Sequence, residues 1–267
     1  MPSYIDLSLR ITDPLDDSRL FAIGAEPQAA RVLYRSMLPQ QEGGRALLAP
    51  PLYYQLAAGT ADVRAVNDFV LDEAEAQGAL LGAFCTVEPK YGDHAVRELE
   101  RVAARGAKGV VWSPRAQGLF GDDATLIALH RQAHALGLRS IFRSEPYSLN
   151  EALWRGWTMA RACPEAPLII SGALGAWDNV QAIVGMKGGA DNIVYDTAEL
   201  APTVSLAPLV ALLGADRFLF ATGGLERPDT AAARVEAQLR ESGAGEDVVE
   251  AILWRNAARL LGLEEGL

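Results

Sequence analysis

The sequence predicts an α/β protein that folds as one (β/α)8 TIM barrel. Short apolar runs typical of strands alternate with longer amphipathic runs typical of helices along almost the whole chain. Eight such units follow one another within 267 residues, and a closed parallel barrel typically needs eight units in about 250 residues. The strand cores Gly-Val-Val-Trp, Leu-Ile-Ile and Phe-Leu-Phe are almost entirely apolar, as expected for strands that are buried on both faces.

Each predicted strand is followed by a helix, and a glycine ends several of the helical runs, where it stops a helix readily. Pro27 suits the first turn of the first helix, because its missing N–H has no partner to lose there. The predicted strands are Tyr4–Arg10, Arg45–Ala49, Leu80–Thr86, Lys108–Ser113, Arg139–Arg143, Leu168–Ser171, Asn192–Asp196 and Arg217–Thr222. The predicted helices are Pro27–Leu38, Ala61–Gln77, Asp93–Arg105, Asp123–Leu136, Leu149–Ala162, Trp177–Met186, Leu206–Leu213, Thr230–Glu241 and Asp247–Leu261.

A doubly wound open sheet also alternates strands with helices, and it is the competing fold. Such a sheet usually carries a glycine-rich phosphate loop after its first strand. The corresponding stretch here is Leu7-Ser8-Leu9-Arg10, which contains no glycine, so the barrel is favoured. No linker composition interrupts the repeat, and residues 1–267 are therefore expected to form a single domain.

Composition and charge exclude several classes of protein. The chain has 24 basic and 34 acidic residues, a net charge of −10, which argues against binding to nucleic acid or to an anionic membrane. Cys85 and Cys163 are too few for a disulfide framework. The first residues lack the pattern of a signal peptide, and no stretch approaches the ~20 apolar residues that span a bilayer. We therefore expect a soluble, cytoplasmic protein, and the alanine-rich helices and preference for arginine suggest a bacterial source.

In a TIM barrel the active site lies at the carboxyl ends of the strands and in the loops that follow them. These positions carry polar and aromatic side chains but no histidine: Ser8, Arg10, Tyr53, Tyr54, Cys85, Glu88, Trp112, Arg115, Arg143, Glu145, Ser171, Tyr195, Asp196, Thr222, Glu226 and Arg227. His130 and His134 share one helix face, but the glutamate of the metalloprotease motif is missing, so we expect solvated helix residues. Cys85 has no histidine placed to activate it, and we expect a small buried side chain.

Four stretches along the chain carry a recognisable pattern. They are Ala107-Lys-Gly-Val-Val-Trp-Ser-Pro with the run to Gly137-Leu138, Asn192-Ile-Val-Tyr-Asp-Thr, Leu213-Gly-Ala-Asp-Arg-Phe-Leu-Phe and Asn256-Ala-Ala-Arg-Leu-Leu-Gly-Leu. Together they resemble the amidohydrolase-related family (amidohydrolase 2), which contains decarboxylases and hydrolases similar to aminocarboxymuconate semialdehyde decarboxylase. The resemblance covers most of the chain in order. Because the matched stretches are mainly scaffold, it implies the barrel fold more directly than an activity.

The resemblance also implies where metal ligands would lie, and other residues stand at those positions. The His-x-His that ends the family's first strand is Ser8-Leu9-Arg10 in this chain, and the histidine that ends the fifth strand is Arg143. The histidine after the sixth strand falls on Gly172 or Ala173, and the aspartate of the eighth strand falls on Gly223. A divalent metal needs about three to four converging N, O or S ligands. We therefore expect no metal site and no cofactor.

Arg10 and Arg143 stand at two of these former ligand positions, and two interpretations of them stay open. If both guanidinium groups point into the barrel mouth, they form a site for a carboxylate or phosphate with bidentate geometry. Otherwise each arginine turns outward or pairs with an internal carboxylate such as Glu88, Glu145 or Asp196. Ala221-Thr-Gly-Gly is likewise either a phosphate cradle, as barrel loops at this position often are, or a tight turn.

Two functions follow. Lactonases of the wider superfamily that act on pyrone dicarboxylates work without a metal and hold substrate carboxylates with arginines. The resemblance thus implies a metal-independent hydrolase for a small carboxylated substrate, in which a carboxylate activates water. The candidate catalytic residues are Asp196 and Glu145, and the candidate substrate-binding residues are Arg10, Arg143, Ser8, Tyr53, Trp112 and Thr222.

The alternative is a non-catalytic barrel that binds an anionic metabolite or a protein partner, because those lactonases retain histidines and an eighth-strand aspartate that this chain lacks. A mouth plugged by Tyr53, Trp112 or Tyr147 would favour this alternative. Barrels of this kind are often dimers, so a homodimer is one candidate assembly.

Overall fold

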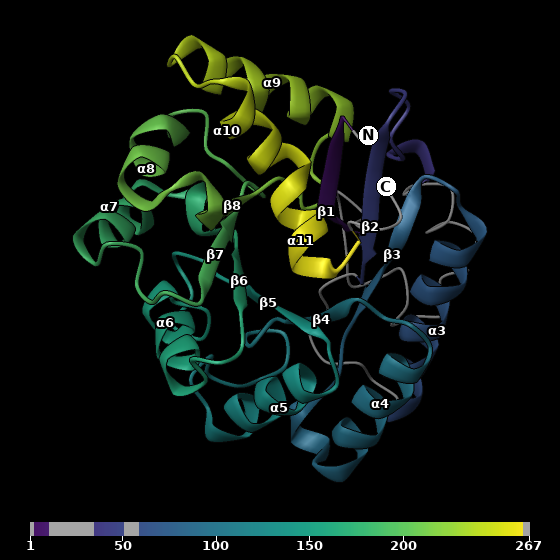
Figure 1. Cartoon of the computed structure of the whole chain (residues 1–267). Helices are drawn as coiled ribbons and strands as arrows, with labels where there is room; N and C mark the ends of the chain where they lie inside the picture. Colours follow the sequence, from purple (N-terminus) through teal and green to yellow (C-terminus); the bar gives the residue numbers. More distant parts are fainter. Residues whose placement is uncertain (1–2, 11–34, 51–58, 264–267) are drawn as a thin grey trace.

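The computed structural model describes residues 3–10, 35–50 and 59–263, and it arranges eight strands as a barrel surrounded by helices (Figure 1). The strands follow one another around the sheet in chain order, and each pairs with the next in parallel. The Leu7 N–H donates to the Phe220 carbonyl oxygen at 3.0 Å. This bond ties the first strand to the segment after the last and closes the sheet, so the predicted (β/α)8 TIM barrel is confirmed.

The strands are short, as is usual for a barrel of this class. They are β1 (Tyr4–Arg10), β2 (Gly44–Ala49), β3 (Leu80–Cys85), β4 (Gly109–Trp112), β5 (Arg139–Arg143), β6 (Leu168–Ser171), β7 (Ile193–Asp196) and β8 (Phe218–Leu219). The described helices are α3 (Thr60–Ala76), α4 (Asp93–Ala104), α5 (Ala124–Ala135), α6 (Leu153–Ala162), α7 (Trp177–Gly185), α8 (Leu206–Leu213), α9 (Pro228–Glu241), α10 (Glu246–Glu250) and α11 (Asn256–Leu261). A π-helical turn, Ala251–Arg255, joins α10 to α11.

Most element boundaries agree with the sequence-based prediction, and the exceptions have local causes. The helix expected at Pro27–Leu38 lies largely outside the described residues. Helix α6 begins at Leu153, later than predicted, because residues 145–151 form a turn held by the Glu145 N–H to Glu151 carbonyl bond of 3.0 Å. Strand β8 ends early, since the Ala221 N–H donates to the Thr197 hydroxyl at 3.0 Å instead of extending the ladder.

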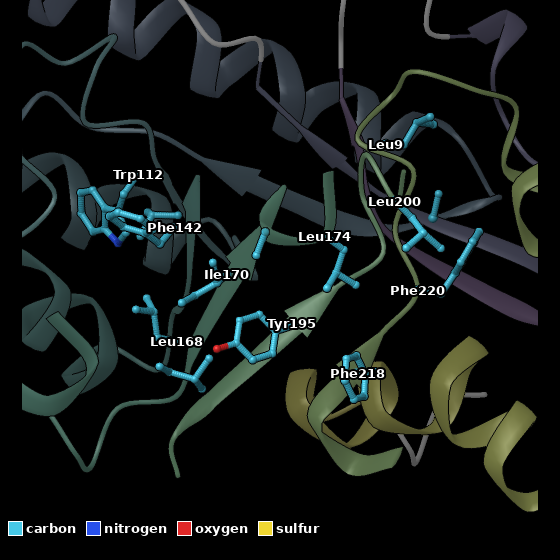
Figure 2. Close-up of a cluster of buried hydrophobic side chains, with 14 of the residues drawn as sticks. Leu9, Trp112, Phe142, Leu168, Ile170, Leu174, Tyr195, Leu200, Phe218 and Phe220 are labelled. Carbon is cyan, nitrogen blue, oxygen red and sulfur yellow. The ribbon is translucent and has the colours of Figure 1, made fainter. Parts of the chain in front are cut away.

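The strands bury apolar side chains on both faces, which explains their nearly continuous apolar runs. One set, including Leu7, Val111 and Ile141, fills the barrel interior. The other set, including Trp112 and Phe142, packs against the helices in the layer outside the strands (Figure 2). Successive residues of a strand point to opposite faces, so each strand contributes to both clusters.

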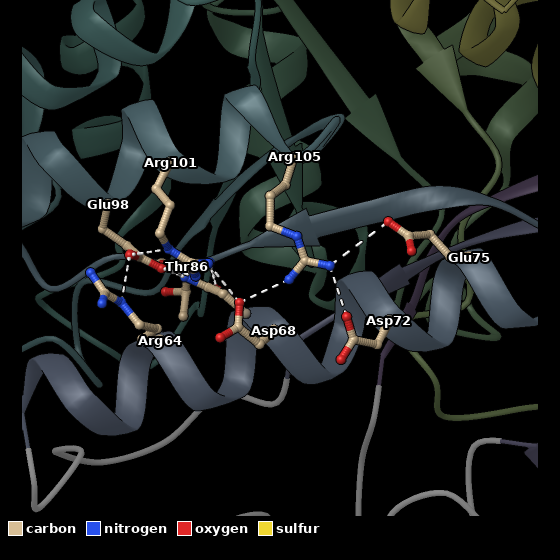
Figure 3. A network of polar contacts seen from close by, with 9 residues as sticks. Arg64, Asp68, Asp72, Glu75, Thr86, Glu98, Arg101 and Arg105 are labelled. Carbon is tan, nitrogen blue, oxygen red and sulfur yellow. Dashed lines mark hydrogen bonds and ion pairs between the residues drawn. The ribbon is translucent and has the colours of Figure 1, made fainter.

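Helices α3 and α4 are joined by a network of ion pairs (Figure 3). Arg101 of α4 binds Asp68 of α3 at 2.6 Å and Glu98 of its own helix at 2.7 Å. Arg105, which follows the last residue of α4, binds Asp68 at 2.9 Å and Asp72 at 2.7 Å. The network fixes the position of α3 relative to α4. Within the described ranges, no helix combines the length and apolar character needed to cross a membrane.

Candidate functional site

A small cavity lies at the carboxyl ends of the strands, inside the barrel mouth. Its lining residues come from strands on both sides of the barrel: Ser8, Arg10, Ala49, Val111, Ile141, Arg143 and Ser171. Val111 and Ile141 belong to the apolar interior, whereas two hydroxyls and two guanidinium groups supply the polar lining. The cavity measures about 10 Å³, roughly the space that one buried water needs. Arg10 and Arg143 therefore border the same cavity.

Arg143 is held by two carboxylates. Its Nη1 donates to Glu199 Oε1, and its Nη2 donates to Glu145 Oε2 at 3.4 Å. Burial opposes the charged form of this arginine, but the carboxylates of Glu199, Glu151 and Glu145 outweigh burial and raise the pKa of its guanidinium. The internal ion pair that was one of the two interpretations is thus present, with Glu145 as one predicted partner and Glu199 as an unpredicted one.

The end of β1 is shaped by the turn after β8. The pairing of β1 with β2 shifts register between Asp6 and Leu9. Gly224 has a φ of 75°, and a Cβ there would lie 2.4 Å from the Arg10 carbonyl oxygen, so only glycine fits. The Thr222 hydroxyl donates to Asp6 Oδ2 at 2.6 Å and accepts from the Gly224 N–H at 3.1 Å. The Ala221-Thr-Gly-Gly stretch is therefore a tight turn packed on β1.

Asp196, the last residue of β7, is fully buried. Its Oδ1 accepts from the Ala198 N–H at 3.1 Å, whereas its Oδ2 has no hydrogen-bond partner in the described part of the chain. Burial raises the pKa of this carboxyl to about 7, and Glu199 adds to the rise, while the neighbouring Ser171 hydroxyl and Arg10 work in the opposite direction. A carboxylate with a pKa near neutrality is suited to general-base catalysis at neutral pH.

Two hydroxyls that line the cavity are also buried without partners among the described residues. They are Ser8 Oγ and Ser171 Oγ. Buried polar atoms in folded proteins almost always have a hydrogen-bond partner. A group that enters the cavity would therefore meet the unused hydroxyls of Ser8 and Ser171.

The remaining predicted site residues lie elsewhere or have other partners. Tyr53 is outside the described residues. The Trp112 indole packs in the layer between strands and helices, where its Nε1 donates to the Ser140 hydroxyl at 2.9 Å. Tyr147 is 89% exposed, so neither Trp112 nor Tyr147 plugs the mouth. Glu88 pairs with Lys90 at 3.2 Å.

Three acidic residues of the mouth region were not predicted from the sequence. Asp6 is fully buried and accepts from the Ser8 N–H at 3.1 Å, and burial raises its pKa to about 6. Glu151 accepts from the Ser113 hydroxyl at 2.7 Å, and Glu199 binds Arg143. Asp6 had a signal, because it is the one carboxylate in the strand sequence Tyr4–Arg10. Glu199 had none, because it lies in a loop.

The expectation that His130 is a solvated helix residue was wrong. His130 is 1% exposed, and its Nδ1 lies 2.8 Å from the Ser140 hydroxyl. Burial lowers its pKa to about 4, so the ring is neutral at physiological pH. Cys85 is buried, as expected, and burial raises the pKa of its thiol.

The residues at the mouth do not fit a divalent metal ion. Among the described residues, no three or more His, Cys, Asp or Glu side chains are grouped in a way that could hold one. Arg10 and Arg143 line the cavity, and the positive charge of a guanidinium group repels a cation.

The sequence matches no known family and no curated protein, but the fold matches solved structures along their whole length. The 2,6-dihydroxybenzoate decarboxylase from Rhizobium is 17% identical with a TM-score of 0.72, covering 99% of this chain and 100% of the other. The dihydroxybenzoic acid decarboxylase from Polaromonas sp., solved with manganese and an inhibitor, is 19% identical with a TM-score of 0.68, covering 99% and 98%. A candidate 2-pyrone-4,6-dicarboxylic acid hydrolase from Pseudomonas putida is 15% identical with a TM-score of 0.60, covering 98% of both.

A structure described as a candidate amidohydrolase from Staphylococcus aureus is 16% identical with a TM-score of 0.67, covering 97% of this chain and 99% of the other. At this level of identity the similarity concerns the fold. The family resemblance inferred from the sequence is therefore confirmed in the architecture of the barrel, and the chemistry has to be argued from the mouth itself.

Proposed function

We propose that the protein is a metal-independent hydrolase that acts on a small carboxylated compound at the barrel mouth. The observation that carries the proposal is Asp196, a fully buried carboxyl with an unpartnered Oδ2 among the described residues and a pKa of about 7. Its neighbour Ser171 lines a cavity that Arg10 and Arg143 border. A negatively charged substrate group and a water activated by a carboxylate would both find partners there.

Each mouth residue has a role in this scheme. Arg10 and Arg143 bind the carboxylate of the substrate through charge-assisted hydrogen bonds. Asp196, once ionised, removes a proton from water as the water oxygen attacks the carbonyl carbon of an ester or lactone, a step to which general-base catalysis contributes about 10²–10⁴-fold. The bond between that carbon and the alkoxy oxygen then breaks, and the proton held by Asp196 passes to the leaving oxygen. Glu145, beside Arg143, is the second candidate base. Ser8 and Ser171 can donate hydrogen bonds to the substrate.

The composition of the mouth supports chemistry without a metal. The Polaromonas neighbour was solved with manganese, but in this chain Ser8, Arg10 and Arg143 stand where the family resemblance puts metal ligands. Arginine does not ligate a divalent metal at neutral pH, because it stays protonated. We extend the proposal to a single domain over residues 1–267, a bacterial source and a cytoplasmic location, with a homodimer as the candidate assembly.

A second function is favoured by one specific observation. Glu199 and Glu145 already neutralise Arg143 in the free protein, which is what a barrel that has lost its chemistry would also show. In that case the mouth binds an anionic metabolite or a protein partner without turnover.

The test is a screen of carboxylated lactones and esters in buffer containing a chelator. We expect Asp196→Asn to lower kcat by about 10²-fold with little change in KM, and Arg143→Gln to raise KM. Glu236→Gln, which removes an exposed carboxylate of α9 that binds Arg240, is the matched control and should leave both constants unchanged.

The outcomes separate the two functions. If carboxylates raise the melting temperature of the wild type but not of Arg143→Gln, and no compound is turned over, the binding function holds and the hydrolase is rejected. If carboxylates stabilise Arg143→Gln as much as the wild type, the arginine cavity is the wrong site.

A further inference from the structure

Glu199 occupies a backbone position that rarely carries such a side chain. The segment Thr197–Leu200 is a turn in which the Leu200 N–H donates to the Thr197 carbonyl oxygen at 3.0 Å. Glu199 is the third residue of this turn and has a φ of 61°. Turns that need a positive φ at this position strongly favour glycine or asparagine, and non-glycine residues with such a φ are uncommon.

The backbone around Glu199 is fixed on both sides. The Ala198 N–H donates to Asp196 Oδ1 at 3.1 Å, and the Ala201 N–H donates to the Leu174 carbonyl oxygen at 3.1 Å. The strained conformation is therefore imposed by the surrounding structure, and the side chain is aimed at one place. Strained residues of this kind cluster at functional sites.

The carboxylate of Glu199 reaches the arginine that borders the cavity. Its Oε1 accepts from Arg143 Nη1, and the Glu199 side chain retains 20% exposure, compared with 14% for Arg143. The second carboxylate on this arginine, from Glu145, is further away at 3.4 Å. Glu199 is thus the principal counter-ion of Arg143, and it lies where water still has access.

We propose that Glu199 fills the carboxylate subsite of the mouth in the free protein, and that the carboxylate of a substrate displaces it from Arg143. The inference rests on the proposed function, because it concerns the same arginine. The exchange replaces one carboxylate by another, so the buried guanidinium is never left without a counter-ion, which would be costly. Glu199 then determines specificity, since a ligand must compete with it.

The same geometry selects the class of anion. One carboxylate group of a ligand replaces the single negative charge that Glu199 places next to Arg143. A phosphate dianion would bring a second negative charge next to Glu145, whose Oε2 lies 3.4 Å from Arg143 Nη2, and like charges at such separations repel. The subsite should therefore prefer carboxylates to inorganic phosphate.

The experiment is calorimetric titration of the full chain with isophthalate (benzene-1,3-dicarboxylate) and with inorganic phosphate. While the Glu199 carboxylate occupies Arg143, a ligand can bind only during the fraction of time in which the site is free. Removing Glu199 therefore raises the affinity for the ligand by the inverse of that fraction. We expect Glu199→Gln to bind isophthalate at least about tenfold more tightly than the wild type. Glu199→Gly, which accepts the positive φ without strain, should show the same gain. Glu145→Gln is the matched control and should gain less than about threefold, because its contact with Arg143 is longer.

Adding Arg143→Gln to Glu199→Gln should abolish the gain, and phosphate should bind none of the proteins. Equal isophthalate affinity in the wild type and in both Glu199 variants, with loss of binding in Arg143→Gln, would overturn the inference and leave the proposed function standing. Weaker binding by the Glu199 variants would also overturn it, because Glu199 would then position Arg143. If isophthalate binds no variant, or Arg143→Gln has no effect, the proposed carboxylate site itself fails.

Discussion

Asp196 and Asp6 are two fully buried carboxyl groups at the barrel mouth, and burial makes their charged forms costly. The pKa of Asp196 is raised to about 7 and that of Asp6 to about 6, in both cases chiefly by burial. Proteins commonly accept such a cost at functional sites. The two carboxyls should therefore make the stability of the fold depend on pH.

Replacing Asp196 by asparagine should flatten that dependence. Between about pH 4 and pH 7 the unfolded carboxyl releases its proton while the folded one keeps it, so stability falls as pH rises through this window. A rise in pKa from 3.8 to about 7 corresponds to a loss of up to about 4 kcal/mol. Because asparagine resembles the protonated acid, the stability of Asp196→Asn should exceed that of the wild type by more at pH 8 than at pH 5.

Thermal unfolding of both proteins at pH 5 and pH 8 measures this difference. Asp6 contributes a loss of the same sign in both proteins, so only part of the wild-type decline should disappear. An equal decline in the wild type and the variant would mean that Asp196 is already ionised in the folded protein at pH 5.

Lys187 offers a test of backbone strain away from the mouth. It follows the end of α7, has a φ of 48° and is exposed. A side chain in this left-handed conformation costs about 1–2 kcal/mol, and glycine gives back part of that through its greater freedom in the unfolded chain. We expect Lys187→Gly to stabilise the fold by about 0.5–1 kcal/mol in chemical denaturation. Lys187→Ala removes the charge but keeps the positive φ. If Lys187→Ala stabilises the fold as much as Lys187→Gly, backbone strain is not the cause of the gain.

The sequence predicted which residues end the strands, but it could not predict where every side chain points. Arg143 and Asp196 end strands β5 and β7 as predicted, because strand ends can be located from the alternation of strands and helices. Trp112 was expected at the mouth, yet it packs outward, because a strand that is apolar on both faces carries no signal of which face is inside. Glu199 was missed because its contact with Arg143 depends on a turn with a positive φ. The usual sequence signal for such a turn is a glycine, and this chain has a glutamate at that position.

At the scale of elements, the pairing of α3 with α4 depends on two arginines in different surroundings. Arg101 binds Glu98, whose side chain is 9% exposed, whereas Arg105 binds Asp72, whose side chain is 62% exposed (Figure 3). Removing the partner of a buried charge costs more than removing an exposed ion pair. The first arginine should therefore contribute much more to stability than the second.

Arg101→Leu should destabilise the fold by about 2 kcal/mol, because Glu98 is left buried with an incomplete set of partners. Arg105→Leu is the matched variant on the same helix face and should cost less than about 1 kcal/mol. Urea denaturation of the two variants measures both values. Equal losses would show that the network acts as a set of surface ion pairs.

The element boundaries were predictable where local chemistry decides them. Strands β1, β5 and β6 and helix α8 have the predicted bounds, because an apolar run and a flanking glycine or polar residue act within a few positions. Strand β8 was predicted too long, because its last residues bind Thr197 and Asp6 from distant parts of the chain. Such long-range partners leave no trace in the local sequence.

At the scale of the whole molecule, a chain with a net charge of −10 places two arginines around its mouth cavity. An acidic protein attracts cations in general, so a resident metal would be expected to bind wherever ligands converge. At this mouth the carboxylates of Glu199 and Glu145 are instead paired with Arg143, so they face a guanidinium group rather than an open cation site.

This contrast leads to a prediction about metal removal. Incubation with a chelator followed by desalting should change the melting temperature by less than about 1 °C, and adding zinc or manganese at equimolar concentration should not restore or raise it. A ligand present at a hundred times its Kd that binds only the folded state adds about 2.7 kcal/mol to stability. A specific metal site would therefore shift the melting temperature measurably.

Elemental analysis of the purified protein should find no stoichiometric zinc or manganese. If the protein holds a stoichiometric metal ion and Arg143→Gln does not change the metal content, the ion lies away from the mouth. If Arg143→Gln gains or loses a metal ion, the arginine site and the proposed metal-independent hydrolase are both overturned.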